Sequence, residues 1–255
     1  MKITFLGTGT SQGVPVIACD CEVCASPDKK DKRFRSSVLI EAGDKTFVID
    51  TGPDFRTQML SNNVKKLDFI LLTHDHRDHL AGLDDIRSFN WIQKRPIDIY
   101  AENYVLNAVH HFYEYIFAEN KYPGIPEVNL TEINENPFNA HGIKIVPVRG
   151  FHFHLPVFGF RIGKFAYITD VNMIPESEFA KLKDLDVLVI NALRIKKHIS
   201  HFCLQEAIEA AQRIAAGKTY FTHISHLMGF HSIVNPQLPE NMELAFDGLK
   251  FTIKE

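Results

Sequence analysis

Four side chains that bind metal ions well lie within the six-residue segment 74–79, whose sequence is HDHRDH. The segment follows an apolar run that predicts a short strand over residues 69–73. A chain that turns as it leaves a strand can direct His74 and His76 to one point, and Asp78 and His79 to a neighbouring point. Two metal ions held close together would use all four side chains, so the spacing predicts a binuclear metal site. A polar loop that contains these residues by chance is the alternative, and the spacing disfavours it.

These four side chains do not complete the coordination of two ions, so further ligands must come from other strand ends. Candidates follow later predicted strands: His152 or His154, then Asp170, then His223. Because one carboxylate can coordinate two ions, Asp170 is the natural bridging ligand. Asp170 could instead begin the helix that follows it, and the residues alone leave the choice between His152 and His154 open.

The histidine and cysteine content also points to metal binding. The chain has 13 His and 4 Cys, and Cys19, Cys21 and Cys24 are clustered. The opening residues MKITFLGTGT lack the longer apolar region of a signal peptide, which predicts a reducing, cytoplasmic setting. In such a setting clustered thiols bind metal more often than they form disulfides. No run approaches 18 consecutive apolar residues, so we expect no membrane span and no membrane partner.

The segments that must position these residues form a mixed α/β pattern. Some segments alternate apolar and polar residues or form short apolar runs, and others show helical periodicity. No repeat, low-complexity segment or linker divides the chain, so residues 1–255 are expected to form one domain. The predicted strands are 2–6, 38–41, 46–49, 69–73, 143–148, 157–162, 165–169, 187–190 and 220–222. Two helices are predicted over 105–117 and 204–215, and Gly217 would end the second. A further helix is predicted between the strands 165–169 and 187–190, with Pro175 in its first turn.

The charge balance limits the class of partner. With 28 basic and 31 acidic residues, the net charge is −3. A protein that binds long nucleic acids holds many phosphates with Lys and Arg, so this composition disfavours a long polynucleotide. Arg33 and Arg35 could reach an anionic substrate, although a solvated basic strand edge is the simpler interpretation.

The order of these residues resembles the metallo-β-lactamase superfamily of binuclear hydrolases. The resemblance rests on Asp50-Thr51-Gly52, the 74–79 motif, His152, Asp170 and His223, and it spans nearly the whole chain. It implies an α/β fold, an αββα sandwich with the site at one edge of the sheets. It also implies the ligand sets: His74, His76 and His152 on one ion, Asp78, His79 and His223 on the other, and Asp170 bridging. Relatives carry the third ligand seven residues before a strand glycine, here Gly159, which selects His152 over His154.

A closer resemblance is to the PhnP branch of that superfamily, which contains a phosphoribosyl cyclic phosphodiesterase. It rests on the opening segment 7–15 (GTGTSQGVP), on the three clustered cysteines and on the segment 222–226 (THISH). The branch implies a structural zinc held by Cys19, Cys21, Cys24 and His226. Three thiolates and one imidazole make a closed tetrahedral site, which would join the loop near 19–24 to the loop that holds His223. Three reduced cysteines in a mobile loop are the alternative.

The same branch resemblance singles out His201, 22 residues before His223. There the corresponding histidine lies near the metals and contacts the phosphate or the leaving group, so we expect His201 to be catalytic, together with Asp78. His201 could instead merely begin the helix at Leu204. Residues 103–126 depart from the minimal core of the family and could form core, a subunit interface or a lid.

The sequence therefore predicts a binuclear metal-dependent hydrolase, and we expect a phosphodiesterase that cleaves a small cyclic or diester phosphate. Its cofactors would be two divalent ions, Zn²⁺ or Mn²⁺, and one structural Zn²⁺. A lactone or thioester hydrolase is the main alternative, because fold does not fix chemistry. A tRNA 3′-processing nuclease would need a large basic arm, and a non-catalytic metal-binding scaffold would not need the full ligand set. The expected partner is a small phosphate ester, and a homodimer is compatible with the sequence.

Overall fold

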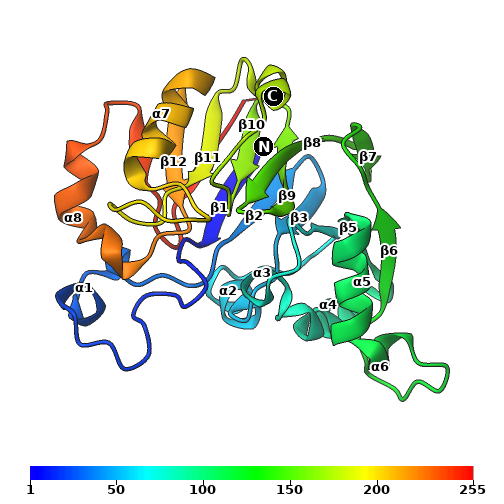
Figure 1. The fold of residues 1–255 in the computed structure, drawn as a ribbon. Helices are drawn as coiled ribbons and strands as arrows, with labels where there is room; N and C mark the ends of the chain where they lie inside the picture. Colours follow the sequence, from blue (N-terminus) through cyan, green and yellow to red (C-terminus); the bar gives the residue numbers. More distant parts are fainter. Residues whose placement is uncertain (255) are drawn as a thin grey trace.

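Two seven-stranded β-sheets lie face to face in the computed structural model, which describes residues 1–254 (Figure 1). The first sheet has the strand order β14-β1-β2-β3-β4-β5-β6. Strands β3 to β6 run parallel to one another, whereas β14, β1, β2 and β3 are joined by antiparallel pairs. The bounds are β1 Lys2–Gly7, β2 Ser37–Ala42, β3 Lys45–Ile49, β4 Phe69–Leu71, β5 Ile97–Ala101, β6 Val128–Glu132 and β14 Lys250–Thr252.

The second sheet has the order β13-β12-β11-β10-β9-β8-β7. Strands β10 to β13 run parallel, and β7 to β10 form an antiparallel meander. The bounds are β7 Phe138–Ala140, β8 Ile143–His152, β9 Leu155–Ile162, β10 Phe165–Ile168, β11 Val187–Asn191, β12 Lys218–Thr222 and β13 Met242–Leu244. All the predicted strands are present, although several are longer or shorter, while β5, β6, β7, β13 and β14 were not predicted.

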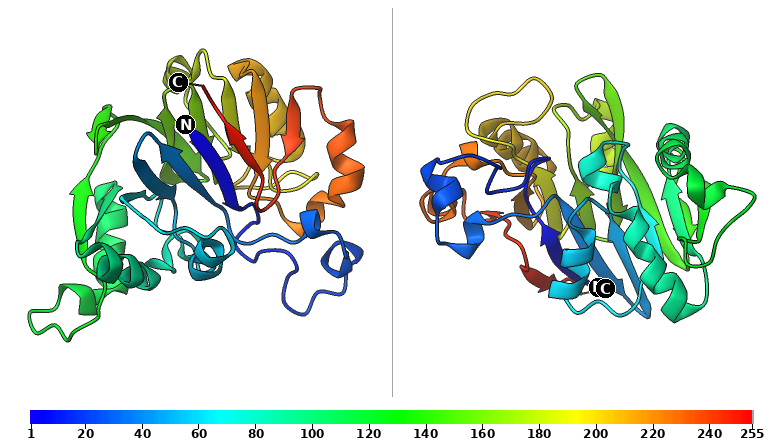
Figure 2. Two further views of the ribbon diagram at one scale, coloured as in Figure 1. Left: turned by 180° about the vertical axis from the view of Figure 1, so that it is seen from behind. Right: turned by 90° about the horizontal axis from the view of Figure 1, so that it is seen from below.

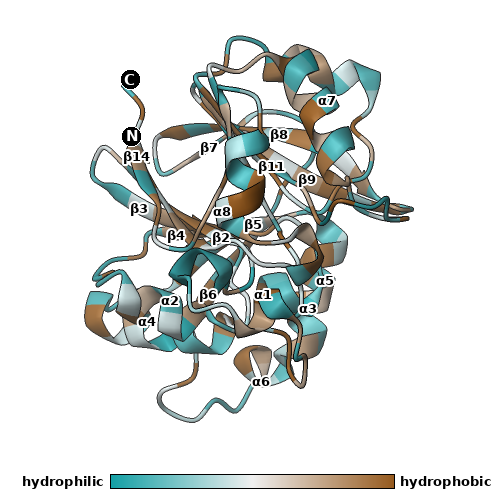
Figure 3. Ribbon diagram, turned by 90° about the vertical axis from the view of Figure 1, so that its left-hand side faces the viewer, coloured by the Kyte–Doolittle hydropathy of each residue, from teal (hydrophilic) through white to brown (hydrophobic). Residues whose placement is uncertain are grey.

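Short helices connect and cover the strands. Their bounds are α1 Glu22–Ala25, α2 Phe55–Ser61, α3 Arg77–Leu80, α4 Arg87–Gln93, α5 Asn103–Phe112, α6 Glu114–Phe117, α7 Leu204–Ile214 and α8 His231–Val234. Figure 3 shows α7 on one side of the strand layers and α2 and α4 on the other. The result is the predicted αββα sandwich, a single α/β domain.

Alternation of side chains along the strands builds the cores. In β1, Ile3 and Phe5 point between the two sheets and are fully buried, while Leu6 points to the outer face. Phe55 and Val105, from α2 and α5, pack on that outer face of the first sheet. The outer face of the second sheet is covered in the same way by α7. Each sheet is thus buried on both faces, as expected for sheets with parallel strands.

The helices differ from their predictions at specific points. The expected helix 105–117 is interrupted at Tyr113, whose backbone leaves the helical region and whose hydroxyl donates to the Leu80 carbonyl oxygen at 2.9 Å. The segment after Pro175 is a 3-10 helix, Glu176–Leu182, and Pro175 precedes its first turn. α7 ends at Ile214, and the left-handed residue after it is Ala215 rather than Gly217.

The two termini lie side by side at one end of the sandwich (Figure 2). β1 and β14 pair antiparallel, and the amino group of Met1 donates to the Ile253 carbonyl oxygen at 2.9 Å. The loops that carry the predicted site residues lie at the other end. Over residues 1–254, no helix is both long enough and apolar enough to span a bilayer.

Candidate metal centre

The predicted ligands follow the carboxyl ends of strands from both sheets. Segment 74–79 follows β4 and enters α3, while Asp170 and His223 follow β10 and β12. Asp170 and His223 both have left-handed backbones, with φ of 55° and 56°. This conformation is uncommon for residues other than glycine and is often found at functional sites. Because parallel strands end at the same edge, the loops from both sheets meet there.

The Asp170 carboxylate lies at the centre of the cluster. Its Oδ1 is 2.7 Å from His223 Nδ1, and its Oδ2 is 3.1 Å from His79 Nε2 and 3.5 Å from His74 Nε2. Asp170 belongs to two groups of donors whose ligand atoms lie within 4.8 Å of one another: His74, His76 and Asp170 form one group, and Asp78, His79, Asp170 and His223 form the other. The structure therefore brings these predicted ligands together in two adjoining groups that share one carboxylate.

Several buried ring nitrogens in this cluster lack a hydrogen bond of good geometry within the described chain. They are His74 Nε2, His79 Nε2, His201 Nε2 and His223 Nδ1. Buried polar atoms nearly always have partners, and an unpartnered one calls for an explanation such as an ion. Imidazole and carboxylate donors together suit divalent ions such as Zn²⁺. The residues present therefore fit divalent metal ions.

His152 lies beside the first donor group but is not part of it by the same distance criterion. Its ring centroid is 5.0 Å from that of His76 and 6.1 Å from that of His74. Its Nδ1 donates to the Ser200 carbonyl oxygen at 2.9 Å, which leaves Nε2 free to act as a ligand. His154 is exposed and packs against the Phe153 ring, away from the donors, in keeping with the choice of His152.

Asp50 orients His79 through the ring nitrogen that faces away from the donor cluster. The sequence analysis did not predict this role. Its carboxylate accepts hydrogen bonds from Thr73 N and Oγ1, both at 2.9 Å, and from His79 Nδ1 at 2.7 Å. Asp50 is fully buried and has a left-handed backbone with φ of 67°. A carboxylate on the far nitrogen of a ligand histidine fixes its tautomer and its orientation. The only signal in the sequence was the Asp50-Thr51-Gly52 turn itself.

Electrostatics favour a cation at this position. Burial lowers the pKa of His74, and it lowers the pKa of His152 to about 4, so both rings are neutral donors at pH 7. Burial also lowers the pKa of His79, but the carboxylates of Asp170, Asp78 and Asp50 outweigh it and hold that pKa well above its usual value. Three carboxylates around one ring create a negative field that a divalent ion would neutralise.

His201 borders the cluster with its ring edge directed inward. Its Nε2 is 3.8 Å from Asp170 Oδ2, and its ring centroid is 4.4 Å from that of His152. On its other edge, Nδ1 lies 3.1 Å from Ser200 Oγ and 3.3 Å from His198 Nδ1. The helix α7 begins at Leu204 with Cys203 as its N-cap, so His201 lies outside that helix. The structure thus places His201 beside the donors without making it one of either group.

The second predicted site is assembled from distant segments. His226 Nδ1 lies 3.4 Å from Cys19 Sγ, 3.2 Å from Cys21 Sγ and 3.5 Å from Cys24 Sγ. A sulfur and a nitrogen bound to one tetrahedral zinc lie about 3.6 Å apart, given ordinary bond lengths. The hydrogen bonds from Cys24 N and His226 lower the pKa of Cys21 to about 6, whereas burial raises that of Cys24 to about 11. The four residues therefore fit a structural zinc site.

The expectation of a solvated basic edge was wrong for Arg33. Arg33 is 5% exposed, and its Nη1 donates to Thr8 Oγ1 at 2.7 Å and to the Ala245 carbonyl oxygen at 2.6 Å. These partners offset the cost of burying the guanidinium. Arg35 is partly exposed and pairs with Asp54 at 3.1 Å. Both arginines thus bind to residues of the protein instead of extending into solvent as a basic edge.

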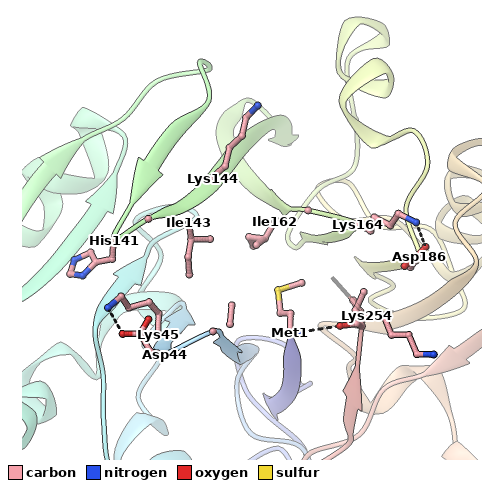
Figure 4. Close-up of a pocket in the computed structure, with 15 residues that line it drawn as sticks. Met1, Asp44, Lys45, His141, Ile143, Lys144, Ile162, Lys164, Asp186 and Lys254 are labelled. Atoms are coloured by element: carbon pink, nitrogen blue, oxygen red, sulfur yellow. Dashed lines mark hydrogen bonds and ion pairs between the residues drawn. The ribbon is translucent and has the colours of Figure 1, made fainter.

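A large cavity lies at the opposite end of the sandwich, away from these donors (Figure 4). Its volume is about 790 Å³, and Ile143 and Ile162 contribute apolar surface while Lys45 and Lys164 lie at its edge. Lys45 pairs with Asp44, and Lys164 with Asp186. None of the predicted site residues lines it. The volume of a cavity therefore does not identify the reactive centre of this molecule.

Comparison with known families agrees with this geometry. Residues 45–224 match a family model described as a beta-lactamase superfamily domain. The chain belongs to this superfamily. A crystal structure of a diphosphatase from the PhnP family is 40% identical, with a TM-score of 0.92, over 98% of this chain and 96% of that one. The predicted resemblance to PhnP-type metallo-β-lactamase proteins is thereby confirmed.

Two curated relatives carry other names. A protein of Porphyromonas gingivalis named octanoyltransferase is 40% identical over 259 residues, which cover all of this chain and 52% of that protein. A ribonuclease Z of Staphylococcus carnosus is 25% identical over 75% of this chain and 61% of its own length. This chain thus spans little more than half the length of these curated relatives. The name octanoyltransferase describes a protein twice as long, and the match does not locate that activity in the shared half.

Proposed function

We propose that this chain is a binuclear metal-dependent hydrolase that cleaves a small phosphodiester or diphosphate. The observation that carries the proposal is the position of Asp170, which belongs to both donor groups and has one oxygen at 2.7 Å from His223 and the other at 3.1 Å from His79. A carboxylate shared in this way is suited to join two neighbouring ions. His201, outside both groups, supplies a further polar group directed at the same point.

In this proposal His74, His76 and His152 would hold one ion, Asp78, His79 and His223 would hold the other, and Asp170 would contribute to both. Bound divalent ions lower the pKa of water to supply a nucleophile near pH 7 and neutralise charge on phosphate oxygens. Asp78 stays ionised, because the neighbouring His79 and His223 outweigh burial and lower its pKa. Asp50 keeps the Nε2 of His79 directed at the centre.

His201 is proposed to assist the leaving group. With its Nδ1 facing Ser200 and His198, the His201 ring keeps Nε2 directed into the site. A proton on Nε2 could pass to a departing alkoxide or remain as a hydrogen bond to it. Such assistance matters most for substrates with poor leaving groups. Loss of a metal ligand would instead lower the rate for all substrates.

Diphosphate cleavage is a second candidate because the PhnP-family neighbour at 40% identity is a diphosphatase. Both reactions attack phosphorus and release an oxygen leaving group, so the same residues serve either. Lactone or thioester hydrolysis remains a rival, since related folds support several chemistries. Processing of tRNA is disfavoured by the net charge of −3 and by the lack of a basic arm in the sequence.

We also propose that Cys19, Cys21, Cys24 and His226 bind a structural Zn²⁺, and that the catalytic ions are Zn²⁺ or Mn²⁺. The S–N distances support the first statement, because they are close to those expected around one zinc. A cytoplasmic location, a homodimer, and the absence of long nucleic acid and membrane partners stay predictions. Light scattering coupled to size exclusion would test the homodimer.

A parallel substrate panel tests the proposed function. The metal-loaded protein would be assayed on bis-nitrophenyl phosphate, a 2′,3′-cyclic nucleotide, ribose 1,2-cyclic phosphate, a diphosphate diester, a homoserine lactone and a glutathione thioester. His76→Ala should lose turnover, while the matched control His110→Ala, at an exposed position on α5, should keep it. Turnover of the lactone or thioester at least tenfold above every phosphorus substrate would contradict the proposal. Equal activity of His76→Ala and the wild type would reveal contamination.

A further inference from the structure

The turn that follows His152 contains an unusual residue. β8 and β9 are joined by the two-residue turn Phe153-His154, with His152 paired to Leu155. Phe153 has a φ of 58°, which a bulky side chain rarely adopts and which favours glycine in hairpin turns of this length. Its side chain is 48% exposed, so burial in a core does not explain it. A strained residue beside a candidate ligand calls for a functional explanation.

Asn172 holds this turn against two other loops of the site. Phe153 N donates to Asn172 Oδ1 at 2.8 Å, and Asn172 Nδ2 donates to the Ile199 carbonyl oxygen at 3.0 Å. The backbone of Met173 is joined to that of Phe151 by a hydrogen bond of 2.9 Å. The backbones of residues 153, 173 and 199 are therefore fixed relative to one another.

Each of these three positions carries an exposed apolar side chain. Met173 is 45% exposed and Ile199 is 67% exposed, and with Phe153 we call them the apolar rim. Single exposed apolar residues are common on protein surfaces, but a group of them beside a polar site often marks a binding surface.

The apolar rim adjoins the reactive centre on the side of His152 and His201. Phe153 follows His152 directly, and Ile199 precedes His201 by two residues. Ser200, between them, accepts the hydrogen bond from His152 Nδ1 through its carbonyl oxygen. A substrate bound at Asp170 that reached past His152 or His201 would therefore meet the apolar rim.

We propose that the apolar rim binds a planar aromatic group of the substrate, an aryl ring or a nucleobase, by contact with Phe153. The inference rests on the proposed function and narrows its substrate class to phosphodiesters or diphosphates that carry an aromatic ring. Phe153 is 48% exposed and its ring packs against the His154 ring, with centroids 3.8 Å apart, so a flat ring of the substrate would extend an existing pair of rings. Stacking of a base on an aromatic side chain typically strengthens binding about 5- to 150-fold.

Two small phosphonates test the proposal by binding to the metal-loaded, full-length chain in calorimetry. Phenylphosphonate and methylphosphonate present the same head group, so their affinity ratio isolates the ring. We expect the wild type to prefer phenylphosphonate about tenfold. Phe153→Gly, which suits the backbone at this position, should bring the ratio near one, while Phe153→Trp should retain it. Trp91→Ala removes an exposed aromatic residue on α4 and should leave the ratio unchanged.

The outcomes separate this proposal from the proposed function. If methylphosphonate binds and phosphodiesters are turned over, but the wild-type ratio is near one, the aromatic preference is wrong and the hydrolase proposal stands. The same conclusion holds if Phe153→Gly keeps the ratio. If neither phosphonate binds although phosphodiesters are turned over, the aromatic preference is overturned and the hydrolase proposal stands. If, in addition, no phosphorus substrate is cleaved, both proposals are overturned.

Discussion

The ring of His201 is held so that one nitrogen contacts protein and the other faces the donors. We expect His201→Ala to keep both catalytic ions and to lose about 10²–10⁴-fold in kcat on substrates with poor leaving groups, the usual value of acid–base assistance. The loss should shrink with nitrophenolate, which leaves without a proton. Metal analysis and kcat across a leaving-group series would check this. An equal loss for every leaving group would exclude the acid role, and loss of metal would make His201 a ligand.

The Asp50 carboxylate determines how His79 presents its Nε2. Asp50→Asn should weaken binding of the catalytic ion near His79 by about 10–100-fold, because its amide nitrogen cannot accept the hydrogen bonds that both carboxylate oxygens accept now. The Cys19–His226 site should keep its affinity, which provides an internal control in the same molecule. Titration with a metal indicator would measure both. An unchanged affinity at the catalytic centre would show that His79 needs no orienting partner.

The sequence indicated the metal-binding residues, the local ones by their spacing and the distant ones by their strand-end positions and the family resemblance, but it did not reveal the contacts that support them. The 74–79 motif is compact in the chain, so its spacing alone indicated metal binding. Asp50 contacts His79 across 29 residues, and Ser200 reaches His152 across 48 residues, so these roles depend on tertiary structure. Arg33 was misjudged for the same reason, since its buried partners Thr8 and Ala245 come from distant segments.

At the scale of elements, a close backbone contact holds segment 74–79 against the turn after β3. A Cβ atom at Gly52 would lie 2.1 Å from the Asp78 carbonyl oxygen, so only glycine fits there. Gly52→Ala should therefore displace Asp78 and reduce kcat/KM by at least tenfold. Gly43→Ala is the control, because its added Cβ would meet no atom within 4 Å; its φ of 56° strains an alanine there, but the position lies in the turn between β2 and β3, far from the site. Kinetics of both variants would decide, and full activity of Gly52→Ala would contradict the close contact.

The elements themselves were predicted best where their patterns were long and regular. α7 has five apolar positions at helical spacing, and only its end was misplaced, since Ala215 adopts the left-handed conformation that glycine usually provides. The helix 105–117 was predicted as continuous because periodicity cannot show that Tyr113 turns to reach Leu80. Short edge strands such as β7 and β13 carry too few residues for a pattern to emerge.

At the scale of the whole molecule, a buried histidine joins the amino-terminal loop to the last third of the chain. His231 N donates to Asp31, and burial together with Arg33 lowers the pKa of the His231 ring to about 4. The unfolded chain takes up a proton near pH 6.5 and the folded chain does not, so stability is full above that pH and falls as pH drops toward 4.

His231→Gln should remove this contribution. Between pH 7 and pH 5, the wild type should lose roughly 2 kcal/mol more of unfolding free energy than His231→Gln. Urea unfolding of the metal-loaded proteins at both pH values would measure the difference. Release of metal in acid destabilises both proteins, so its effect largely cancels when the two losses are compared. An identical loss in the two proteins would mean that the ring titrates normally in the folded state.

The proposed structural zinc would join the first 25 residues to the loop that carries His223 and His226. We expect three metal ions per chain in freshly purified, fully loaded protein, and Cys21→Ser should remove one of them. Because binding of a structural zinc is coupled to folding, this variant should lose several kcal/mol of stability, while its folded fraction keeps the catalytic ions. Cys203→Ser is the matched control, since serine is a good N-cap for α7 and Cys203 lies outside the site. Elemental analysis with thermal unfolding would check both variants. At most two ions in the wild type, or equal metal content in Cys21→Ser, would show that the four residues pack together without zinc.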